Sequence, residues 1–149
     1  MGELPIEVFF SPNGGCTAAI INEIQQAKSS IKLQAYGYTS KPISEALISA
    51  KKKGIAVVLI LDKSNLKQKT SLFNYVKKNG LHVLIDSSHS IAHNKIIIID
   101  DESVITGSFN FTENAERRNA ENLIIIRDKK TALLYIKNWN LHATHSKSY

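Results

Sequence analysis

The chain has 149 residues, 43% of them hydrophobic, and 19 Lys and Arg against 13 Asp and Glu give it a net charge of +6. This length allows a single domain, residues 1–149, with a core of its own. No apolar run reaches the roughly 20 residues that a membrane-spanning helix needs, and no signal peptide is visible. The positive charge favours polyanionic partners, either nucleic acid or anionic lipid headgroups.

The first half of the chain alternates strand patterns with amphipathic helix patterns. Gly54 and Gly80 each follow a lysine-rich segment, as glycine often does at the end of a helix. Such alternation is typical of parallel strands joined by helices. The expected strands are residues 6–12, 31–40, 55–62 and 81–88, and the expected helices are residues 17–30, 41–54 and 70–80.

The second half predicts three strands in succession and then a helix. The strands are expected at residues 93–100, 102–108 and 121–128, and the helix at residues 130–146. Asp101 and Glu102 are typical of a tight hairpin turn, which makes the strands on either side antiparallel. The whole pattern predicts an α/β fold with a mixed, mainly parallel β-sheet flanked by helices.

A histidine and a lysine stand directly before four consecutive isoleucines. An unbroken run, Ile96–Ile99, suits a strand that is buried on both faces. If the strand begins at His93, then His93 and Lys95 project from the same face because they are two residues apart. Polar groups at the end of such a strand need partners or a function. The simplest alternative to a function is a structural salt-bridge cluster of His93 and Lys95 with Asp100.

The residues that follow this pair complete a longer motif. The spacing H-x-K-x4-D, followed by G-S-x-N, resembles the signature of the phospholipase D superfamily. Glu121 falls where these enzymes often carry an acidic residue, and the order of elements is similar to that of the superfamily's small bacterial endonucleases. The resemblance implies a phospholipase D/nuclease-like α-β-α sandwich. The motif residues in this chain are His93, Lys95, Asp100, Gly107, Ser108 and Asn110.

Each residue type suits attack on a phosphodiester, which is an anionic electrophile. Lys95 supplies a cation beside His93, and Ser108 and Asn110 supply neutral donors for the non-bridging oxygens. His93 can attack phosphorus only as a neutral imidazole whose other nitrogen is oriented by an acceptor. Glu121 is a plausible acceptor, so the predicted catalytic residues are His93, Lys95 and Glu121.

Other polar and aromatic residues near the motif receive supporting roles. Asp100, at the end of the isoleucine strand, is interpreted as a structural or orienting carboxylate. Arg117 and Arg118 are candidates for contacts with backbone phosphates. Phe109 and Phe111 are expected to pack in a core or an interface.

By resemblance, the reaction uses two imidazoles and needs no cofactor. One imidazole forms a covalent phosphohistidine, and a second protonates the leaving oxygen and later activates water. This chain carries the motif once, so the second His93 has to come from another subunit. The resemblance and this count together predict a homodimer with one composite site at its two-fold interface.

A metal site is the rival chemistry. Imidazoles and a carboxylate at suitable spacing bind zinc, but no H-E-x-x-H motif, cysteine pair or acidic cluster is present, so no metal is expected. The single Cys16 is expected to be an ordinary small buried residue. His142 and His145 are interpreted as polar residues of a fraying C-terminus. The candidate ligands of the rival metal site are His82, Asp86, His89 and His93.

The motif does not name the substrate, but three features favour nucleic acid. The chain is small and basic, and it lacks an aromatic-rich amphipathic helix for docking on membranes. We therefore expect a non-specific DNA endonuclease that prefers single strands, with RNA as a possible substrate. A phospholipid hydrolase or transferase and a non-catalytic nucleic-acid-binding module are the alternatives. Family analogy suggests export to the bacterial periplasm or envelope.

Overall fold

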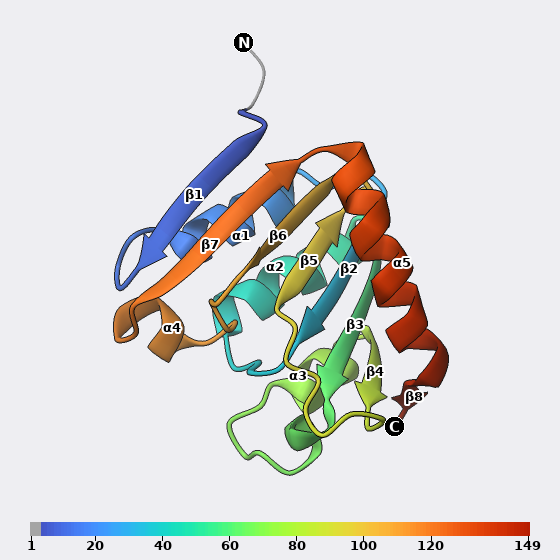
Figure 1. The fold of residues 1–149 in the computed structure, drawn as a ribbon. Coiled ribbons are helices and arrows are strands. Elements are labelled where there is room, and N and C mark those ends of the chain that lie inside the picture. Colours follow the sequence, from blue (N-terminus) through green and yellow to red (C-terminus); the bar gives the residue numbers. More distant parts are fainter. Residues whose placement is uncertain (1–3) are drawn as a thin grey trace.

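A computed structural model describes residues 4–149, and a single eight-stranded sheet with helices on both faces forms the centre of this part of the chain (Figure 1). The order of the strands is β1-β7-β6-β5-β2-β3-β4-β8. The strands are β1 (Ile6–Ser11), β2 (Ser30–Ala35), β3 (Ala56–Asp62), β4 (His82–Asp86), β5 (Ile96–Ile99), β6 (Ser103–Gly107), β7 (Glu121–Arg127) and β8 (Lys147–Ser148). The helices are α1 (Cys16–Gln25), α2 (Lys41–Lys52), α3 (Phe73–Lys78), α4 (Glu113–Arg117) and α5 (Lys129–His145), with a short 3-10 turn at Lys63–Leu66.

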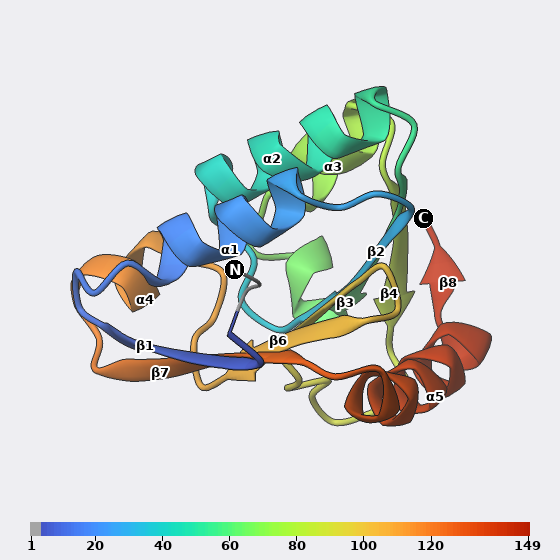
Figure 2. The same cartoon turned by 90° about the horizontal axis from the view of Figure 1, so that it is seen from above.

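The helices form two layers around the sheet. Figure 2 shows α1, α2 and α3 on one face and α5 on the other. The predicted mixed α/β sandwich is confirmed. Parallel pairing is limited to β2–β3 and β3–β4, and the other neighbouring strands are antiparallel. The expectation of a mainly parallel sheet is therefore wrong, because short connections without a crossover helix, such as the β5–β6 hairpin, join strands in antiparallel pairs. None of the helices in residues 4–149 combines the length and the apolar composition that a bilayer crossing requires.

The isoleucine run explains how the two layers are joined. All four side chains of β5 are buried, and they alternate between the faces of the sheet. Ile97 and Ile99 belong to the large core beneath α1 and α2, whereas Ile96 and Ile98 pack with Trp139 of α5. A continuous apolar run is therefore required because both faces of this strand are covered.

The predicted strand at residues 93–100 is too long at its start. β5 begins only at Ile96, which pairs with Gln34 near the end of β2 and with Thr106 near the end of β6. Each neighbouring strand continues for only one more residue, so residues 93–95 have almost no strand to pair with. The hairpin after β5 is confirmed as antiparallel. Its turn is centred one residue earlier than expected, with Asp100 and Asp101 at φ 55° and 56°, a conformation that aspartate tolerates.

Candidate active site

The directions of the strands bring the motif residues to one edge of the sheet, namely the edge formed by the carboxyl ends of β1, β2, β3, β4 and β6. β1, β2, β3, β4 and β6 run one way, whereas β5, β7 and β8 run the other. Ser108, just after β6, therefore lies at the same edge as His93, just before β5, and Glu121, at the start of β7. The carboxyl ends of β2, β3 and β4 open on this edge too, which is the usual place for ligands in α/β sheets.

His93 and Lys95 are in direct contact. The Nζ atom of Lys95 lies 3.0 Å from Nδ1 and 3.1 Å from Nε2 of His93, so the ammonium can donate to whichever nitrogen lacks a hydrogen. The Lys95 residue is 8% exposed, whereas His93 is open to solvent. Burial lowers the pKa of Lys95 below its ordinary value, and the carboxylate of Glu121 opposes part of this effect. The edge thus holds a cation beside an accessible imidazole.

The loop that carries His93, residues 87–95, is held in place by hydrogen bonds to residues at the end of β3 and just after it. The buried carboxylate of Asp62, at the end of β3, accepts a hydrogen bond of 2.7 Å from the backbone N–H of Ala92. Lys63 Nζ donates to the carbonyl oxygen of His89 at 2.7 Å. The ring of Tyr36, just after β2, lies 5.0 Å from the ring of His93. Sequence reasoning missed Tyr36 and Asp62, although their place at the carboxyl ends of parallel strands was an available signal.

Ser108 and Glu121 contact each other. The hydroxyl of Ser108 donates to Glu121 at 2.7 Å and accepts from the backbone N–H of Asn122 at 3.0 Å. The other carboxylate oxygen of Glu121 accepts from the amide of Asn119 at 3.2 Å. Within residues 4–149, no hydrogen bond joins Glu121 to His93, which is the partner that the sequence suggested. In this single chain the Glu121 carboxylate instead accepts hydrogen bonds from Ser108 and Asn119. Its negative charge also raises the pKa of Lys95, against the effect of burial.

Asn110 is positioned by the close approach of its side chain to the backbone of Gly37. The N–H of Gly37 donates to Asn110 Oδ1 at 3.2 Å, which leaves the amide hydrogens of Asn110 free for another partner. A Cβ atom at residue 37 would lie 3.2–3.3 Å from the Asn110 side chain, so the position favours glycine. The half-buried amide is thereby held at the edge that carries His93.

Asp100 lies at the opposite end of β5 from His93. Its carboxylate accepts the backbone N–H groups of Lys28, Ser29 and Ser30 at 2.7–3.1 Å. Partial burial disfavours the charge, but these donors and the Ser29 hydroxyl hold the pKa of Asp100 below its usual range. The contacts agree with the structural interpretation of this carboxylate and keep it away from the edge where a phosphate would meet His93.

Comparison with known proteins gives a consistent result. A family profile described as "Cardiolipin synthase, PLD-like domain" matches residues 20–141. A protein named "Phospholipase D" from Rickettsia prowazekii is 48% identical over 141 residues, which cover 95% of this chain and 69% of that protein. The chain belongs to the phospholipase D superfamily. Superfamily membership identifies it as a phosphodiesterase-type enzyme.

Solved structures of the superfamily match the chain along almost all of its length. Nuc from Salmonella typhimurium, a phospholipase D family member, is 34% identical, with a TM-score of 0.92 and 97% of both chains covered. NucT from Helicobacter pylori is 26% identical, with a TM-score of 0.89 and coverage of 97% of this chain and 98% of that chain. The superfamily fold that the motif implied is therefore confirmed.

The two arginines proposed as phosphate contacts are exposed near the end of α4. Arg117 forms an ion pair of 3.0 Å with Glu113, one turn earlier in the helix, and Arg118 follows it. Arg117 and Glu113 also line a cavity of about 540 Å³ between α4 and the first turns of α1 and α2. Neither His93 nor Lys95 lines that cavity, so the exposed edge, rather than this cavity, is the candidate active site of this phospholipase D-like chain.

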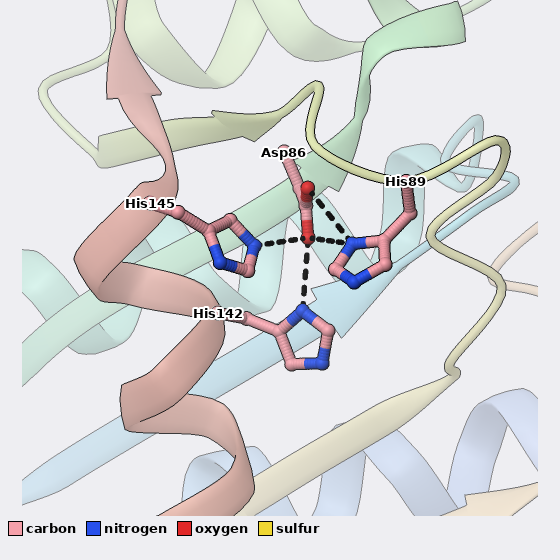
Figure 3. Close-up of side chains that lie close together, drawn as sticks. All are labelled: Asp86, His89, His142 and His145. Atoms are coloured by element: carbon pink, nitrogen blue, oxygen red, sulfur yellow. Dashed lines mark hydrogen bonds and ion pairs between the residues drawn. The ribbon is translucent and has the colours of Figure 1, made fainter.

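The rival histidine set is only partly brought together. His82 is exposed on β4, and His93 contacts Lys95 and Tyr36. Asp86 and His89 do meet, but the residues that join them are His142 and His145 (Figure 3). The interpretation of these two histidines as part of a fraying terminus is wrong, because α5 continues through His145 and both rings pack against the end of β4.

The remaining expectations concern buried residues. Cys16 is fully buried, and burial raises the pKa of its thiol to about 11, which is the opposite of an activated thiolate. Phe109 and Phe111 are buried in the large core, as expected. The motif loop is therefore anchored by its aromatic residues while its polar residues face the edge.

Proposed function

We propose that this chain is a metal-independent phosphodiesterase that acts as a non-specific DNA endonuclease through a phosphohistidine intermediate at a homodimer interface. The observation that carries the proposal is the contact between the exposed imidazole of His93 and the buried ammonium of Lys95. A neutral nucleophile beside a fixed cation suits an anionic phosphodiester, since the cation offsets the charge that repels attack.

The reaction divides into two displacements. In the first, a ring nitrogen of His93 forms a bond to phosphorus while the bond to the leaving oxygen breaks, and the His93 of the second subunit gives that oxygen a proton. In the second, this same imidazole takes a proton from water, the water oxygen attacks phosphorus, and the bond between nitrogen and phosphorus breaks. By analogy with the superfamily's small endonucleases, the products carry 5′-phosphate ends.

The neighbouring polar groups would hold the phosphate oxygens. Asn110 can donate its amide hydrogens, because its oxygen is already engaged by Gly37. Ser108 donates its only hydroxyl hydrogen to Glu121, so it can serve a phosphate only by turning away from that carboxylate. Glu121 is therefore a positioning residue in our proposal. It orients the Ser108 hydroxyl by a hydrogen bond, and its negative charge favours the protonated form of Lys95.

The dimer follows from the need for a second imidazole. Within residues 4–149, neither a hydrogen bond nor a ring contact joins His93 to another histidine. Exposed apolar side chains lie near the site: Ile91 is 52% exposed two residues before His93, and Leu134 of α5 is 66% exposed and lines a small hollow together with Asn94. Apolar groups around an incomplete site favour coverage by a second copy.

Nucleic acid is the substrate that the charge favours. A net charge of +6 raises the local concentration of a polyanion, and the exposed Arg117 and Arg118 offer contacts to backbone phosphates. A single composite centre between two subunits suits one strand better than an intact duplex. DNA, single-stranded by preference, is therefore the substrate we propose, with RNA as the related alternative.

A phospholipid is the second candidate substrate. The observation that favours it is the 48% identity with a protein named "Phospholipase D". The outer edge strand β1 also exposes Ile6, Val8 and Phe10, an apolar surface that could meet a membrane as well as a protein.

The first experiment measures cleavage of labelled single-stranded DNA and plasmid in excess EDTA. We expect cleavage by the wild type and by His82→Ala, a control variant of an exposed histidine outside the site, and none by His93→Ala. Cleavage by His93→Ala, or loss of wild-type cleavage in EDTA while the fold is intact, would disprove the mechanism. Turnover of phosphatidylcholine vesicles without cleavage of DNA would establish the second candidate.

A mixing experiment tests the composite site. Wild type and His93→Ala are unfolded together, refolded in varying ratios and assayed. If each centre needs His93 from both subunits, activity falls with the square of the wild-type fraction, to about a quarter at equal amounts. A linear fall, to about half, would show that each chain works alone.

A further inference from the structure

Four side chains from separate segments meet at the end of β4. Asp86 ends that strand, His89 lies in the following loop, and His142 and His145 occupy the last turn of α5 (Figure 3). His142 Nδ1 lies 2.9 Å, His145 Nε2 3.0 Å and His89 Nδ1 3.2 Å from the same carboxylate oxygen, Oδ2 of Asp86. One candidate ligand atom of each residue lies within 4.8 Å of all the others.

The convergence on one oxygen is difficult to satisfy by hydrogen bonds alone. A carboxylate oxygen has two lone-pair directions, and Oδ2 already faces His142 and His145 at 2.9 and 3.0 Å. His89 Nδ1 lies 3.2 Å from both Oδ1 and Oδ2, and Oδ1 also accepts the backbone N–H of Ser88 at 3.0 Å, so the lone pairs of the carboxylate are crowded. Asp86 is fully buried, and no lysine or arginine within residues 4–149 forms an ion pair with it. A divalent cation between the four side chains would compensate the carboxylate and give each ring a lone-pair acceptor.

We propose that Asp86, His89, His142 and His145 form a structural Zn²⁺ site. Three imidazole nitrogens and one carboxylate oxygen are a donor set that zinc binds in tetrahedral geometry. Four protein ligands close the coordination sphere, so this metal would take no part in cleavage. The ligands come as two local pairs, Asp86 with His89 and His142 with His145, each three residues apart, so only the packing of α5 against β4 is needed to join them.

The site is accessible to a metal. The side chain of His89 is 45% exposed and that of His145 is 33% exposed, which leaves an entry path from solvent. The surrounding structure also shows what the metal would hold. After His145 the two-residue strand β8 pairs with β4, and His89 belongs to the same loop, residues 87–95, as His93. The metal would therefore clamp both α5 and this loop to the sheet.

The test uses the 149-residue chain, stripped of metal with a chelator and then titrated with ZnCl₂. We expect one Zn²⁺ per chain in the wild type and in His82→Ala, whose changed residue lies on the same strand as Asp86 but outside the cluster. The double variant His142→Ala/His145→Ala should bind Zn²⁺ at least about 100-fold more weakly. Zn²⁺ should raise the melting temperature of the first two proteins and leave that of the double variant unchanged.

Two further measurements keep the proposal testable if the double variant folds poorly. Co²⁺ added to the metal-free wild type should give the visible absorption of a tetrahedral ion, and competition with Zn²⁺ should remove it. His89→Gln alters only the exposed loop ligand and should weaken binding by about tenfold or more. Failure of the wild type to bind either metal would overturn the proposal and show a hydrogen-bonded cluster around Asp86.

Discussion

His89 and His93 lie in the same loop, residues 87–95, yet they face opposite charges. His93 contacts the ammonium of Lys95, whereas His89 contacts the carboxylate of Asp86. A ring beside a cation can meet an anionic phosphate, and a ring beside an anion can help to bind a metal cation. The role of a histidine in this loop therefore follows from the charge of its neighbour and not from its place in the sequence.

The largest expected effect is on the rate of DNA cleavage, and it distinguishes the role of His93 from that of His89. His93→Ala should lower the rate of DNA cleavage by at least about 10³-fold because it removes the nucleophile. The same variant should still bind one Zn²⁺ per chain, because its ring does not contact Asp86. Rate assays and metal analysis on one preparation check both statements. If His93→Ala also lost zinc, the two sites would not be separate.

Lys95→Met should reduce cleavage by about 10²- to 10³-fold, because it removes the cation that offsets the charge of the transition state. A pH profile sharpens this prediction. Burial lowers the pKa of Lys95, so wild-type activity should decline with rising pH before an ordinary lysine would lose its proton. Glu121→Gln removes the opposing carboxylate and should move that decline to still lower pH. A decline that stays in place would contradict this electrostatic coupling.

Ser108→Ala should have a smaller effect, about tenfold on the rate, since it removes one neutral hydrogen bond. The variant also frees the Glu121 oxygen that accepts the Ser108 hydroxyl in this structure. The matched change is Thr106→Val, which removes a hydroxyl that donates to the carbonyl oxygen of Lys95 and is two residues away. If both variants lowered the rate equally, a specific role of Ser108 toward phosphate would be untenable.

The smallest effect concerns stability at the far end of β5. Asp100→Asn should lower the free energy of unfolding by about 2 kcal/mol at neutral pH, since a carboxylate that accepts several N–H groups is lost. The folded-state pKa of Asp100 is depressed, so its stabilisation is complete above the unfolded pKa and is lost as pH falls toward the folded pKa.

Urea unfolding at neutral and acidic pH measures this difference. The matched control is Asp101→Asn, which keeps a residue that tolerates positive φ and removes only an exposed ion pair with Lys32. It should cost less than about 1 kcal/mol. Equal losses in the two variants, or a loss for Asp100→Asn that persists in acid, would show that the N–H contacts are not the source of the stability.

The local features of this protein could be predicted from its sequence. Apolar periodicity located the main strands and helices, and the isoleucine run indicated a strand covered on both faces. The spacing of His93, Lys95, Ser108 and Asn110 placed these residues at strand ends, which the fold brings to one edge. Short elements such as α4 and β8 escaped prediction, because a few residues carry too little periodic signal.

Contacts between side chains that are distant in the sequence could not be predicted without the folded structure. His142 lies 56 residues from Asp86, and no local pattern records that α5 packs its last turn against β4. The contact of Glu121 with Ser108 and the separation of Asp100 from His93 likewise depend on strand direction and register. Such contacts arise from the packing of whole elements, a long-range property, whereas sequence periodicity reports only which face of each element is buried.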